Sequence, residues 1–528
     1  MPSRNLKLGA TSLLQALAFG LRNGGGHNEA LCLDVPYTGA GASIGHVPSY
    51  SSFSIDPAFW YEFFGNATVP NEFTFNALQT LWDHGGQPHI RPGGITMDSM
   101  IFNASAGDPV RTTNEEGGIY RTTFGPAYYQ SWDNFPEGTK FTSTLNFGND
   151  SLAIARDMAV ASVKYQADKI DYFELGNEPN NYDSTRWDNS TAAYVRQWKK
   201  WITAIDNAVN RAIGTDTANQ LFGTARWWAS SSTTDETALN IRPVDLIPAG
   251  INSKGQVAQY SIHSYYFATC TPERAAIATI PNILNHTFLT YYAETEIMPS
   301  AQAALDAGSE WIIGEFNSIA CSGNPNVSDT FANALWTVDS QLIYAAGNAS
   351  ACYLHQGATL VFQSSDQTNT AGDDGSPGFS TYDMLYPRTS SKRGPQRALP
   401  TFVGLVFLSE AFATAGTQVR ALDVPASVGD YFAAYAMYHD DCLSKMVVLN
   451  MQPYYGNTTD DYTVAVDVGG KGTLKRMTAP VVDEKDSNRV TYAGQSFRTG
   501  EAEGEMVRER VDGVVRVRGS EGVLISFD

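Results

Sequence analysis

Cysteine is scarce in this sequence. Five cysteines occur in 528 residues, and no two of them have the Cys-x-x-Cys spacing. Zinc and dithiol redox sites commonly use that spacing, so neither kind of site has support here. In a secreted protein an odd count leaves at least one thiol free, and the spacing does not reveal which cysteines pair. The five are Cys32, Cys270, Cys321, Cys352 and Cys442.

Long apolar runs and positive charge are also in short supply. No stretch approaches the roughly 18 uninterrupted apolar residues of a membrane-spanning helix, so we expect no membrane span. Lys and Arg total 35 against 55 Asp and Glu, which gives a net charge of -20. No basic run could follow a phosphate backbone, and nucleic acid is therefore not an expected partner. The nucleophile elbow, the Walker loop and the His-Glu-x-x-His motif are absent too, which disfavours serine hydrolases, nucleotide enzymes and zinc peptidases.

Two features indicate secretion. Residues 1–29 begin with a short charged segment and continue with an apolar stretch, and we interpret them as a signal segment or an N-terminal extension. The chain also has eight Asn-x-Ser/Thr sequons, more than chance would give, so we expect a secreted protein that carries N-glycans. The sequons start at Asn66, Asn103, Asn149, Asn189, Asn285, Asn326, Asn348 and Asn457.

Short apolar runs alternate with helical patterns from Ser51 onward, which predicts an α/β fold with a parallel barrel. Apolar residues recur at three and four positions in residues 151–166, 193–213, 330–346 and 399–415, and these segments are expected to be helices. The expected barrel strands lie near residues 52–55, 88–91, 140–145, 171–175, 221–225, 258–263, 311–314 and 359–363.

The predicted organisation is a (β/α)8 TIM barrel in residues 49–415 followed by an antiparallel β-sandwich in residues 416–528. A strand within residues 30–48 is expected to join that sandwich. The stretch 97–134 is too long for a simple connection between a strand and a helix. Long loops on the catalytic face of a barrel usually shape the substrate cleft, and we expect this one to do so.

Two glutamates that each follow a short apolar run are the main chemical signal. Glu178 stands in Gly-Asn-Glu-Pro directly after 172–175, and Glu315 stands in Ile-Ile-Gly-Glu. Catalytic groups of TIM-barrel enzymes come from the C-terminal ends of different strands. Two carboxyl groups that meet there can divide the work of general acid and nucleophile in glycoside hydrolysis. The pair therefore predicts a retaining glycosidase.

Further motifs show a resemblance to a known family. They are His263-Ser-Tyr-Tyr, Arg91-Pro-Gly-Gly94, and Gly314-Glu-Phe-Asn-Ser running on to Ser328-Asp-Thr. Together with Gly-Asn-Glu178-Pro they resemble glycoside hydrolase family 79, the clan A family of β-glucuronidases and heparanases, and most of all its secreted fungal members. The resemblance covers roughly residues 50 to 415, and the family also has a β-sandwich built from both chain ends.

The resemblance implies roles for five residues. Glu178 takes the position of the acid/base and must be protonated before cleavage, whereas Glu315 takes that of the nucleophile and must be ionised. Asn177 is expected to hydrogen-bond the sugar 2-hydroxyl, and Tyr265 to donate a hydrogen bond to Glu315. His263 lies two positions before Tyr265, on the same face of a strand, and is expected to shape the same pocket. No metal and no cofactor are implied.

Recognition of a glucuronic acid carboxylate is expected to use uncharged donors, because the chain is acidic and has no Arg or Lys between Glu315 and Ser391 except Arg388. The resemblance assigns part of this to backbone amides at Cys321 and Ser322. This chain departs from the heparanase-like Tyr-Gly-Gly there, so a hydroxyl is missing and the mode of recognition is open. The further candidates for the sugar-binding pocket are Gly94, Ala320, Asp56, Gln363 and Tyr382.

The expected activity is retaining exo-hydrolysis of terminal β-D-glucuronic acid, free or 4-O-substituted, from arabinogalactan or proteoglycan side chains. A net charge of -20 disfavours sulfated polyanions such as heparan sulfate. Another clan A activity, such as that of a β-xylosidase, a β-glucosidase or an endo-acting heparanase-like enzyme, would keep both glutamates. A non-catalytic glycan-binding protein is the alternative of a different class.

Overall fold

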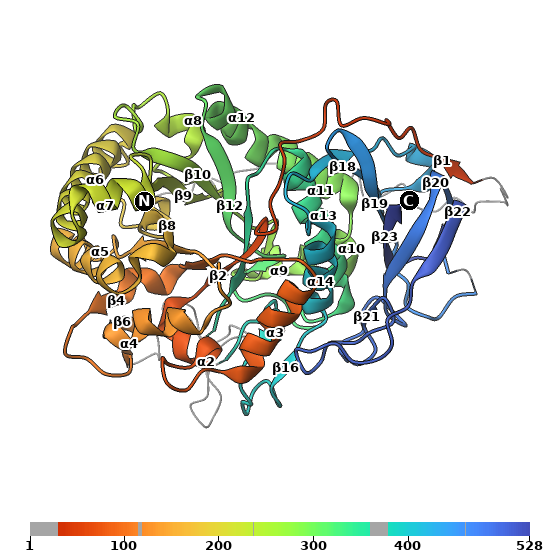
Figure 1. Ribbon diagram of the computed structural model, residues 1–528, viewed down its shortest axis with the longest axis horizontal. Coiled ribbons are helices and arrows are strands. Elements are labelled where there is room, and N and C mark those ends of the chain that lie inside the picture. The colour runs from red at the N-terminus through yellow and green to blue at the C-terminus, as the bar shows by residue number, and fades with distance from the viewer. Residues whose placement is uncertain (1–29, 114–118, 236, 359–377, 460) are drawn as a thin grey trace.

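The computed structural model describes residues 30–113, 119–235, 237–358, 378–459 and 461–528. Figure 1 shows a barrel surrounded by helices and, beside it, a C-terminal sheet drawn in blue. This arrangement confirms the predicted fold class. Within the described residues, no helix is long and apolar enough to cross a membrane.

Eight parallel strands close the barrel, in the order β10-β12-β14-β2-β3-β7-β8-β9. The prediction was wrong for the fifth strand. Residues 221 and 222 are the end of a helix, residues 223–225 belong to the loop after it, and the strand begins at Trp227. The eighth strand precedes the predicted segment 359–363, which lies outside the described residues. The strands are β2 (Ser51–Ile55), β3 (Ile90–Pro92), β7 (Phe141–Leu145), β8 (Ile170–Leu175), β9 (Trp227–Thr233), β10 (Val257–Ser264), β12 (Glu310–Phe316) and β14 (Cys352–Gln356).

Alternation of side chains along the strands builds two separate layers of packing. Trp228, Ile312 and Tyr353 form one small cluster, whereas their neighbours Trp227 and Ile313 belong to the large core that includes the surrounding helices. Successive residues of a strand point to opposite faces, so one set fills the barrel and the other packs outside it.

Helices surround the barrel, and the four predicted from periodicity correspond to α5, α6, α13 and α14. The stretch 97–134 holds a small three-stranded sheet of β4 (Met100–Phe102), β6 (Ile119–Phe124) and β5 (Val110–Thr113). The helices are α2 (Trp60–Phe64), α3 (Glu72–Asp83), α4 (Pro126–Gln130), α5 (Leu152–Gln166), α6 (Thr191–Ile213), α7 (Thr215–Phe222), α8 (Pro243–Leu246), α9 (Pro272–Ile277), α10 (Ile280–Ile283), α11 (His286–Tyr292), α12 (Met298–Asp306), α13 (Phe331–Ala346) and α14 (Thr401–Ala411).

The C-terminal domain is an eight-stranded sheet with the path β1-β20-β23-β19-β18-β17. Its pairs are antiparallel except for β1, the predicted N-terminal strand, which runs parallel to β20. The strands are β1 (Leu31–Cys32), β17 (Gln418–Ala421), β18 (Phe432–His439), β19 (Cys442–Asn450), β20 (Val464–Thr478), β21 (Thr491–Tyr492), β22 (Glu509–Val517) and β23 (Glu521–Phe527), of which β21 and β22 pair with β20 off the main path.

Two buried helices join the sheet to the barrel. α14 is buried on nearly every side, as expected of a helix that is apolar all round, and α13 packs against it. Alternate residues of β18 divide between the two cores: Tyr435 and Met437 contribute to the core shared with the barrel, and Phe432 and Tyr438 to the core of the sheet domain. This shared core holds the barrel against the sheet.

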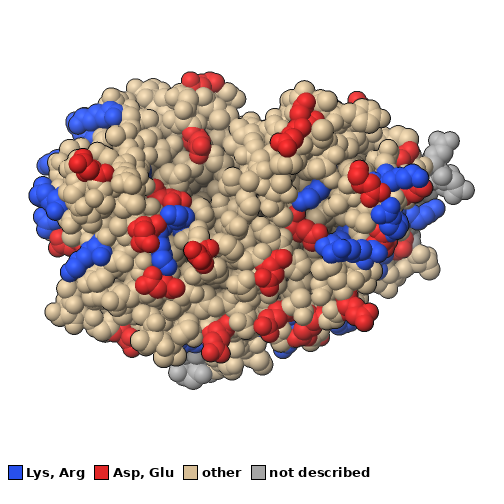
Figure 2. All heavy atoms as spheres, viewed as in Figure 1, with Lys and Arg blue, Asp and Glu red and all other residues tan. Residues whose placement is uncertain are grey.

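Charges are distributed over the surface without a basic stripe on the face shown in Figure 2. On this face Lys and Arg side chains are interspersed with Asp and Glu, and large uncharged areas separate them. The chain as a whole has a net charge of -20.

Candidate active site

Glu178 is placed by a left-handed turn at the end of β8. Gly176 has a φ of 81° and Glu178 a φ of 48°. A Cβ on Gly176 would lie 2.6 Å from the hydroxyl oxygen of Tyr182, so only glycine fits this turn. The amide of Glu178 donates to the carbonyl of Ser231 on β9 at 2.9 Å, which fixes the turn against the neighbouring strand.

A β-bulge aims Glu315 into the barrel. Ile313 pairs with Ile262 on β10, but Glu315 pairs with the next residue, His263, so Gly314 is the extra residue of the bulge. Bulges next to active sites re-aim side chains by interrupting the regular alternation. A Cβ on Gly314 would lie 2.0 Å from the Ser261 hydroxyl oxygen, so this position requires glycine.

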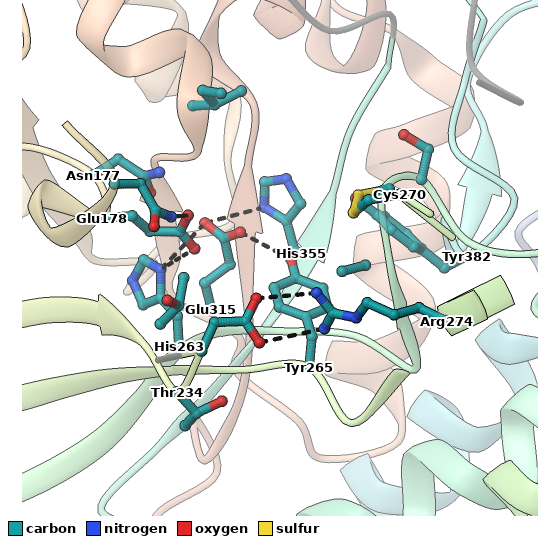
Figure 3. Close-up of a pocket in the computed structure, with 17 residues that line it drawn as sticks. Asn177, Glu178, Thr234, His263, Tyr265, Cys270, Arg274, Glu315, His355 and Tyr382 are labelled. Atoms are coloured by element: carbon teal, nitrogen blue, oxygen red, sulfur yellow. Dashed lines mark hydrogen bonds and ion pairs between the residues drawn. A yellow bond between two sulfur atoms is a disulfide. The ribbon is translucent and has the colours of Figure 1, made fainter. Parts of the chain in front are cut away.

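The two glutamates meet in a pocket of about 210 Å³ at the C-terminal end of the barrel. One oxygen of each carboxyl group and a ring nitrogen of His263 all lie within 4.8 Å of one another. Figure 3 shows the two carboxyl groups facing each other, with His263 beside them. Retaining glycosidases hold their carboxyl groups about 5–5.5 Å apart and inverting ones about 6.5–9.5 Å apart. The nearest oxygens of the two carboxyl groups therefore lie closer together than the spacing given for inverting enzymes.

Hydrogen bonds and positive charge surround Glu315. Arg91 donates to its Oε2 at 2.8 Å and Tyr265 to its Oε1 at 2.8 Å. Burial by itself would raise the pKa of Glu315, but His355 and Arg91 together with the Tyr265 hydroxyl outweigh that effect and lower the pKa below its usual range. Arg91 is the neighbour that stays charged at every accessible pH. Glu315 is therefore ionised and suited to attack.

Glu178 has the opposite environment. Burial and the negative charge of Glu315 raise the pKa of Glu178 above its usual range, although Arg91 and the amide of Asn181 partly oppose this. Nδ1 of His263 lies 3.1 Å from its Oε1. Burial lowers the pKa of His263 to about 4, so this ring is neutral near neutral pH. Glu178 is thus held protonated beside an ionised partner, which is the division that a general acid and a nucleophile need.

Arg91 is buried and fixed by a second acid, Glu174. Nε and Nη2 of Arg91 donate to the two carboxylate oxygens of Glu174 at 2.7 and 3.1 Å, and Nη2 also donates to Oδ1 of Asn177 at 3.0 Å. Burial opposes the charge on Arg91, but Glu174 and Glu315 outweigh it and raise the pKa of Arg91. The sequence reasoning included Arg91 in a motif without giving it a role, although an arginine that ends an apolar strand is a signal for one.

Most of the other predicted residues line this pocket. Tyr265 makes the contact with Glu315 that the resemblance implies, and Cys321 forms a disulfide with Cys270, which joins the loop after β12 to the loop after β10. The catalytic and binding roles of these residues remain predictions. The predicted residues in the wall are Asn177, Glu178, His263, Tyr265, Glu315, Ala320, Cys321, Ser322 and Tyr382.

Three predicted residues are not in this wall. Asp56 is fully buried, accepts a hydrogen bond from the hydroxyl of Thr96, and has its pKa raised to about 6 by burial. A Cβ on Gly94 would lie 2.8 Å from the ring of His355 and 2.9 Å from Asp56. Gly94 therefore packs closely against both His355 and Asp56. Gln363 lies outside the described residues.

Among the wall residues that sequence reasoning missed are His355, Arg274 and Asp235, whose side chains can carry a charge. His355 lies within β14, the eighth barrel strand, with Nδ1 3.7 Å from Oε2 of Glu315. Arg274, on α9, and Asp235, after β9, form an ion pair with N–O distances of 3.2 and 3.3 Å. The expectation of uncharged donors to the sugar carboxylate considered only the residues between Glu315 and Ser391. It was incomplete, because Arg274 reaches the pocket from the loop after β10.

Glu178, His263 and Glu315 are close enough to be considered as metal ligands. The permanent charge of Arg91 lies 2.8 Å from a carboxylate oxygen of Glu315, and a divalent cation there would be repelled by it. The residues therefore do not fit a metal site, and the arrangement fits acid/base and nucleophilic chemistry.

Comparisons with known proteins show similarity to glycoside hydrolases. A family model described as "Glycosyl hydrolase family 79 C-terminal beta domain" matches residues 434–524, and a model described as "Cellulase (glycosyl hydrolase family 5)" matches residues 146–350. The chain is 26% identical over 464 residues to a β-glucuronidase of Aspergillus niger, which covers 84% of this chain and 78% of the relative. It is 25% identical over 442 residues to a β-glucuronidase of Neurospora crassa, which covers 78% of this chain and 73% of the relative.

Among solved structures, a 4-O-α-L-rhamnosyl-β-D-glucuronidase from Fusarium oxysporum has the same fold, with a TM-score of 0.76 and 21% identity over 94% of this chain and all of that one. A family 51 α-L-arabinofuranosidase from Bifidobacterium longum shares the fold with a TM-score of 0.56 and 14% identity, over 94% of this chain and 99% of that one. The matched β domain, the similarity to fungal β-glucuronidases over most of the chain, and the shared fold show that this protein is a β-glucuronidase-like glycoside hydrolase, with a C-terminal domain similar to that of family 79.

Proposed function

We propose that this protein is a retaining exo-β-glucuronidase that removes terminal β-D-glucuronic acid from glycan side chains. The observation that carries the proposal is the facing pair of Glu178, whose pKa is raised, and Glu315, whose pKa is lowered, with oxygens within 4.8 Å of each other. The curated relatives from Aspergillus niger and Neurospora crassa are both β-glucuronidases.

The reaction would proceed by two displacements. A carboxylate oxygen of Glu315 attacks the anomeric carbon as the glycosidic carbon–oxygen bond breaks, and Glu178 gives its proton to the leaving oxygen. A glycosyl ester on Glu315 results. Glu178, now ionised, takes a proton from water while the water oxygen attacks the anomeric carbon. The ester bond breaks, Glu315 is regenerated as a carboxylate, and Glu178 is protonated again.

Substrate specificity would come from the wall opposite Glu178. Ala320, Cys321, Ser322 and Tyr382 line that side and carry no charge, so backbone amides and the Tyr382 hydroxyl are the proposed donors to the sugar carboxylate. The solved relative from Fusarium oxysporum acts on a 4-O-rhamnosylated glucuronide. This supports tolerance of a substituent at O4. The net charge of -20 favours arabinogalactan or proteoglycan ends with one carboxylate over sulfated polyanions.

Secretion and N-glycosylation are part of the proposal. The asparagines of five sequons are exposed, namely Asn103, Asn149, Asn189, Asn326 and Asn457, and the disulfide between Cys270 and Cys321 suits an oxidising compartment. Expression of the full chain in a fungal host, followed by mass analysis of the medium before and after enzymatic removal of N-glycans, tests both points. Protein that stays in the cells or shows no mass change would contradict them.

A panel of 4-nitrophenyl glycosides tests the activity. We expect cleavage of the β-glucuronide to exceed cleavage of the β-glucoside and the β-xyloside, and proton NMR to show the β-anomer as the first product. Glucuronic acid-bearing arabinogalactan should release a monosaccharide or a 4-O-substituted glucuronic acid. Preference for a neutral glycoside would favour another clan A activity. No turnover of any glycoside would favour a glycan-binding protein.

A further inference from the structure

A second hollow continues from the catalytic pocket. It measures about 250 Å³, compared with about 210 Å³ for the pocket, and the two share Thr234, Asp235, Tyr265 and Arg274. Because the two hollows are of similar size, the second has room for about one further sugar. Its outer wall is formed by α11 and the following π-helical turn Ala293–Ile297. We call it the aromatic groove; the outer wall consists of Phe288, Tyr291, Tyr292, Thr295 and Glu296.

The aromatic groove lies on the leaving-group side of the catalytic pair. A general acid must face the glycosidic oxygen, so the leaving group extends from the side of Glu178. The amide of Glu178 is bonded to Ser231 on β9, and Thr234 and Asp235 directly follow that strand. Figure 3 shows Arg274 reaching toward this side, with its guanidinium joined to a carboxylate. The loops proposed to hold the sugar carboxylate follow β12 and β14 instead.

The composition of the groove suits a neutral sugar. A pyranose ring has an apolar face of C–H groups and a rim of hydroxyls, so it can stack on an aromatic ring while polar groups contact its edge. Tyr291 is 63% exposed, and behind it the rings of Tyr266 and Tyr292 pack 4.5 Å apart. Asp235 and Glu296 outnumber the single cation, Arg274, which disfavours a sulfated ring.

Two further observations single out this wall. Tyr291 is exposed beside the partly buried rings of Phe288 and Tyr292, so the groove presents an aromatic surface to a ligand. A π-helical turn interrupts the regular hydrogen bonding of an α-helix and occurs frequently at functional sites. Here the turn places Thr295 and Glu296 beside the aromatic rings.

We propose that the aromatic groove binds a neutral hexose of the leaving group, the sugar to which the glucuronic acid is attached, with its ring stacked on Tyr291. This inference rests on the proposed β-glucuronidase activity and specifies its substrate: an oligosaccharide leaving group with a neutral first sugar. The ion pair of Arg274 with Asp235, which is partly exposed and belongs to both hollows, supplies hydrogen-bonding groups to the hydroxyls of that sugar.

The test compares two substrates that differ only in the leaving group. β-Glucuronyl fluoride loses a single atom that cannot reach the groove, whereas a glucuronosyl-galactose disaccharide loses a hexose. We expect Tyr291→Ala to lower kcat/KM on the disaccharide about 3- to 10-fold, the range of one aromatic contact, and to leave the fluoride within about twofold. Tyr291→Phe keeps the ring and should retain the disaccharide activity. Tyr37→Ala, at a tyrosine that is 88% exposed and is not part of either hollow, is the matched control.

The outcomes separate the groove from the activity itself. Equal losses on both substrates, or no loss on the disaccharide, would overturn the groove. If the unaltered enzyme cleaved no glucuronide, the proposed function would fail. The groove could then be tested by a binding experiment that measures the broadening of the NMR lines of a galactose disaccharide in the presence of the unaltered protein or of Tyr291→Ala. Broadening that is lost in the variant would support the groove. Equal broadening with both proteins, or none with either, would refute it.

Discussion

Tyr265 is expected to control the acidic limb of the pH profile. Its hydroxyl donates to Oε1 of Glu315 at 2.8 Å, and burial together with the charge of Glu315 raises the pKa of Tyr265, which keeps it a donor. In Tyr265→Phe the nucleophile loses one of the bonds that stabilise its ionised form. The pKa of Glu315 should therefore rise, and the variant should lose activity at a higher pH than the unaltered enzyme as the pH falls.

The size of the shift follows from the contact. A hydrogen bond to a charged group contributes about 1.5–3 kcal/mol, and one pKa unit corresponds to about 1.36 kcal/mol. Only 7% of the Glu315 side chain is exposed, so solvent replaces little of the lost bond. We expect the acidic limb to move up by about 1 to 2 pH units. Arg91 keeps its bond to Oε2, so Glu315 should stay ionised near neutral pH.

The assay measures kcat/KM for 4-nitrophenyl β-glucuronide from about pH 3 to about pH 8, a range that covers the usual pKa values of carboxyl and imidazole groups. Tyr129→Phe is the matched control, because Tyr129 is also buried and donates one hydrogen bond, at 3.1 Å, to a backbone carbonyl away from the pocket. Its acidic limb should not move. A Tyr265→Phe enzyme that is slower at every pH, with an unmoved acidic limb, would refute the proposed control of the nucleophile.

Four other predictions concern the same site. Glu315→Gln should abolish turnover of every substrate. Glu178→Ala should impair the cleavage of natural glycosides far more than that of nitrophenyl glycosides, and azide should rescue its activity. Equal impairment on both kinds of substrate without rescue would contradict the assignment of Glu178 as the acid/base. Tyr382→Phe should lower kcat/KM on 4-nitrophenyl β-glucuronide about 10-fold or more and scarcely change any weak β-glucosidase activity, because a hydrogen bond to a charged group contributes about 1.5–3 kcal/mol. Equal losses on both substrates would show that other residues bind the sugar carboxylate, with Arg274 the next candidate. Glu174→Gln should lower the free energy of unfolding by about 3 kcal/mol in denaturant titrations, because breaking a buried pair leaves Arg91 with one partner fewer; an unchanged midpoint would contradict this role. Activity should survive exhaustive chelation, and loss that added metal restores would reverse the conclusion that the glutamate pair does not fit a metal site.

The strands and helices with strong periodicity could be predicted from the sequence, and two strands could not. Trp227–Thr233 has four polar residues in seven, so it did not resemble an apolar run. The neighbouring Leu221 and Phe222 did, but they end α7, where the ring of Phe222 packs 5.3 Å from that of Phe173 on β8. An apolar pair fits a helix face as well as a strand, and only packing decides between them.

The sequence determined the chemistry of the two carboxyl groups. Gly-Asn-Glu178 and Gly-Glu315 each follow an apolar run, and the C-terminal ends of parallel strands meet at one end of a barrel, so their proximity follows from local pattern and fold class alone. The turn at Gly176 and the bulge at Gly314 explain why glycine precedes each motif.

Only the tertiary structure decided which neighbours set the two pKa values and which loops close the pocket. Arg91 bridges Glu174 and Glu315, and Arg274 pairs with Asp235, across separations of 83, 224 and 39 residues. The disulfide between Cys270 and Cys321 spans 51. No local pattern encodes such pairs, because electrostatic interactions depend on distance in space and on burial, and both are defined only once the barrel has closed.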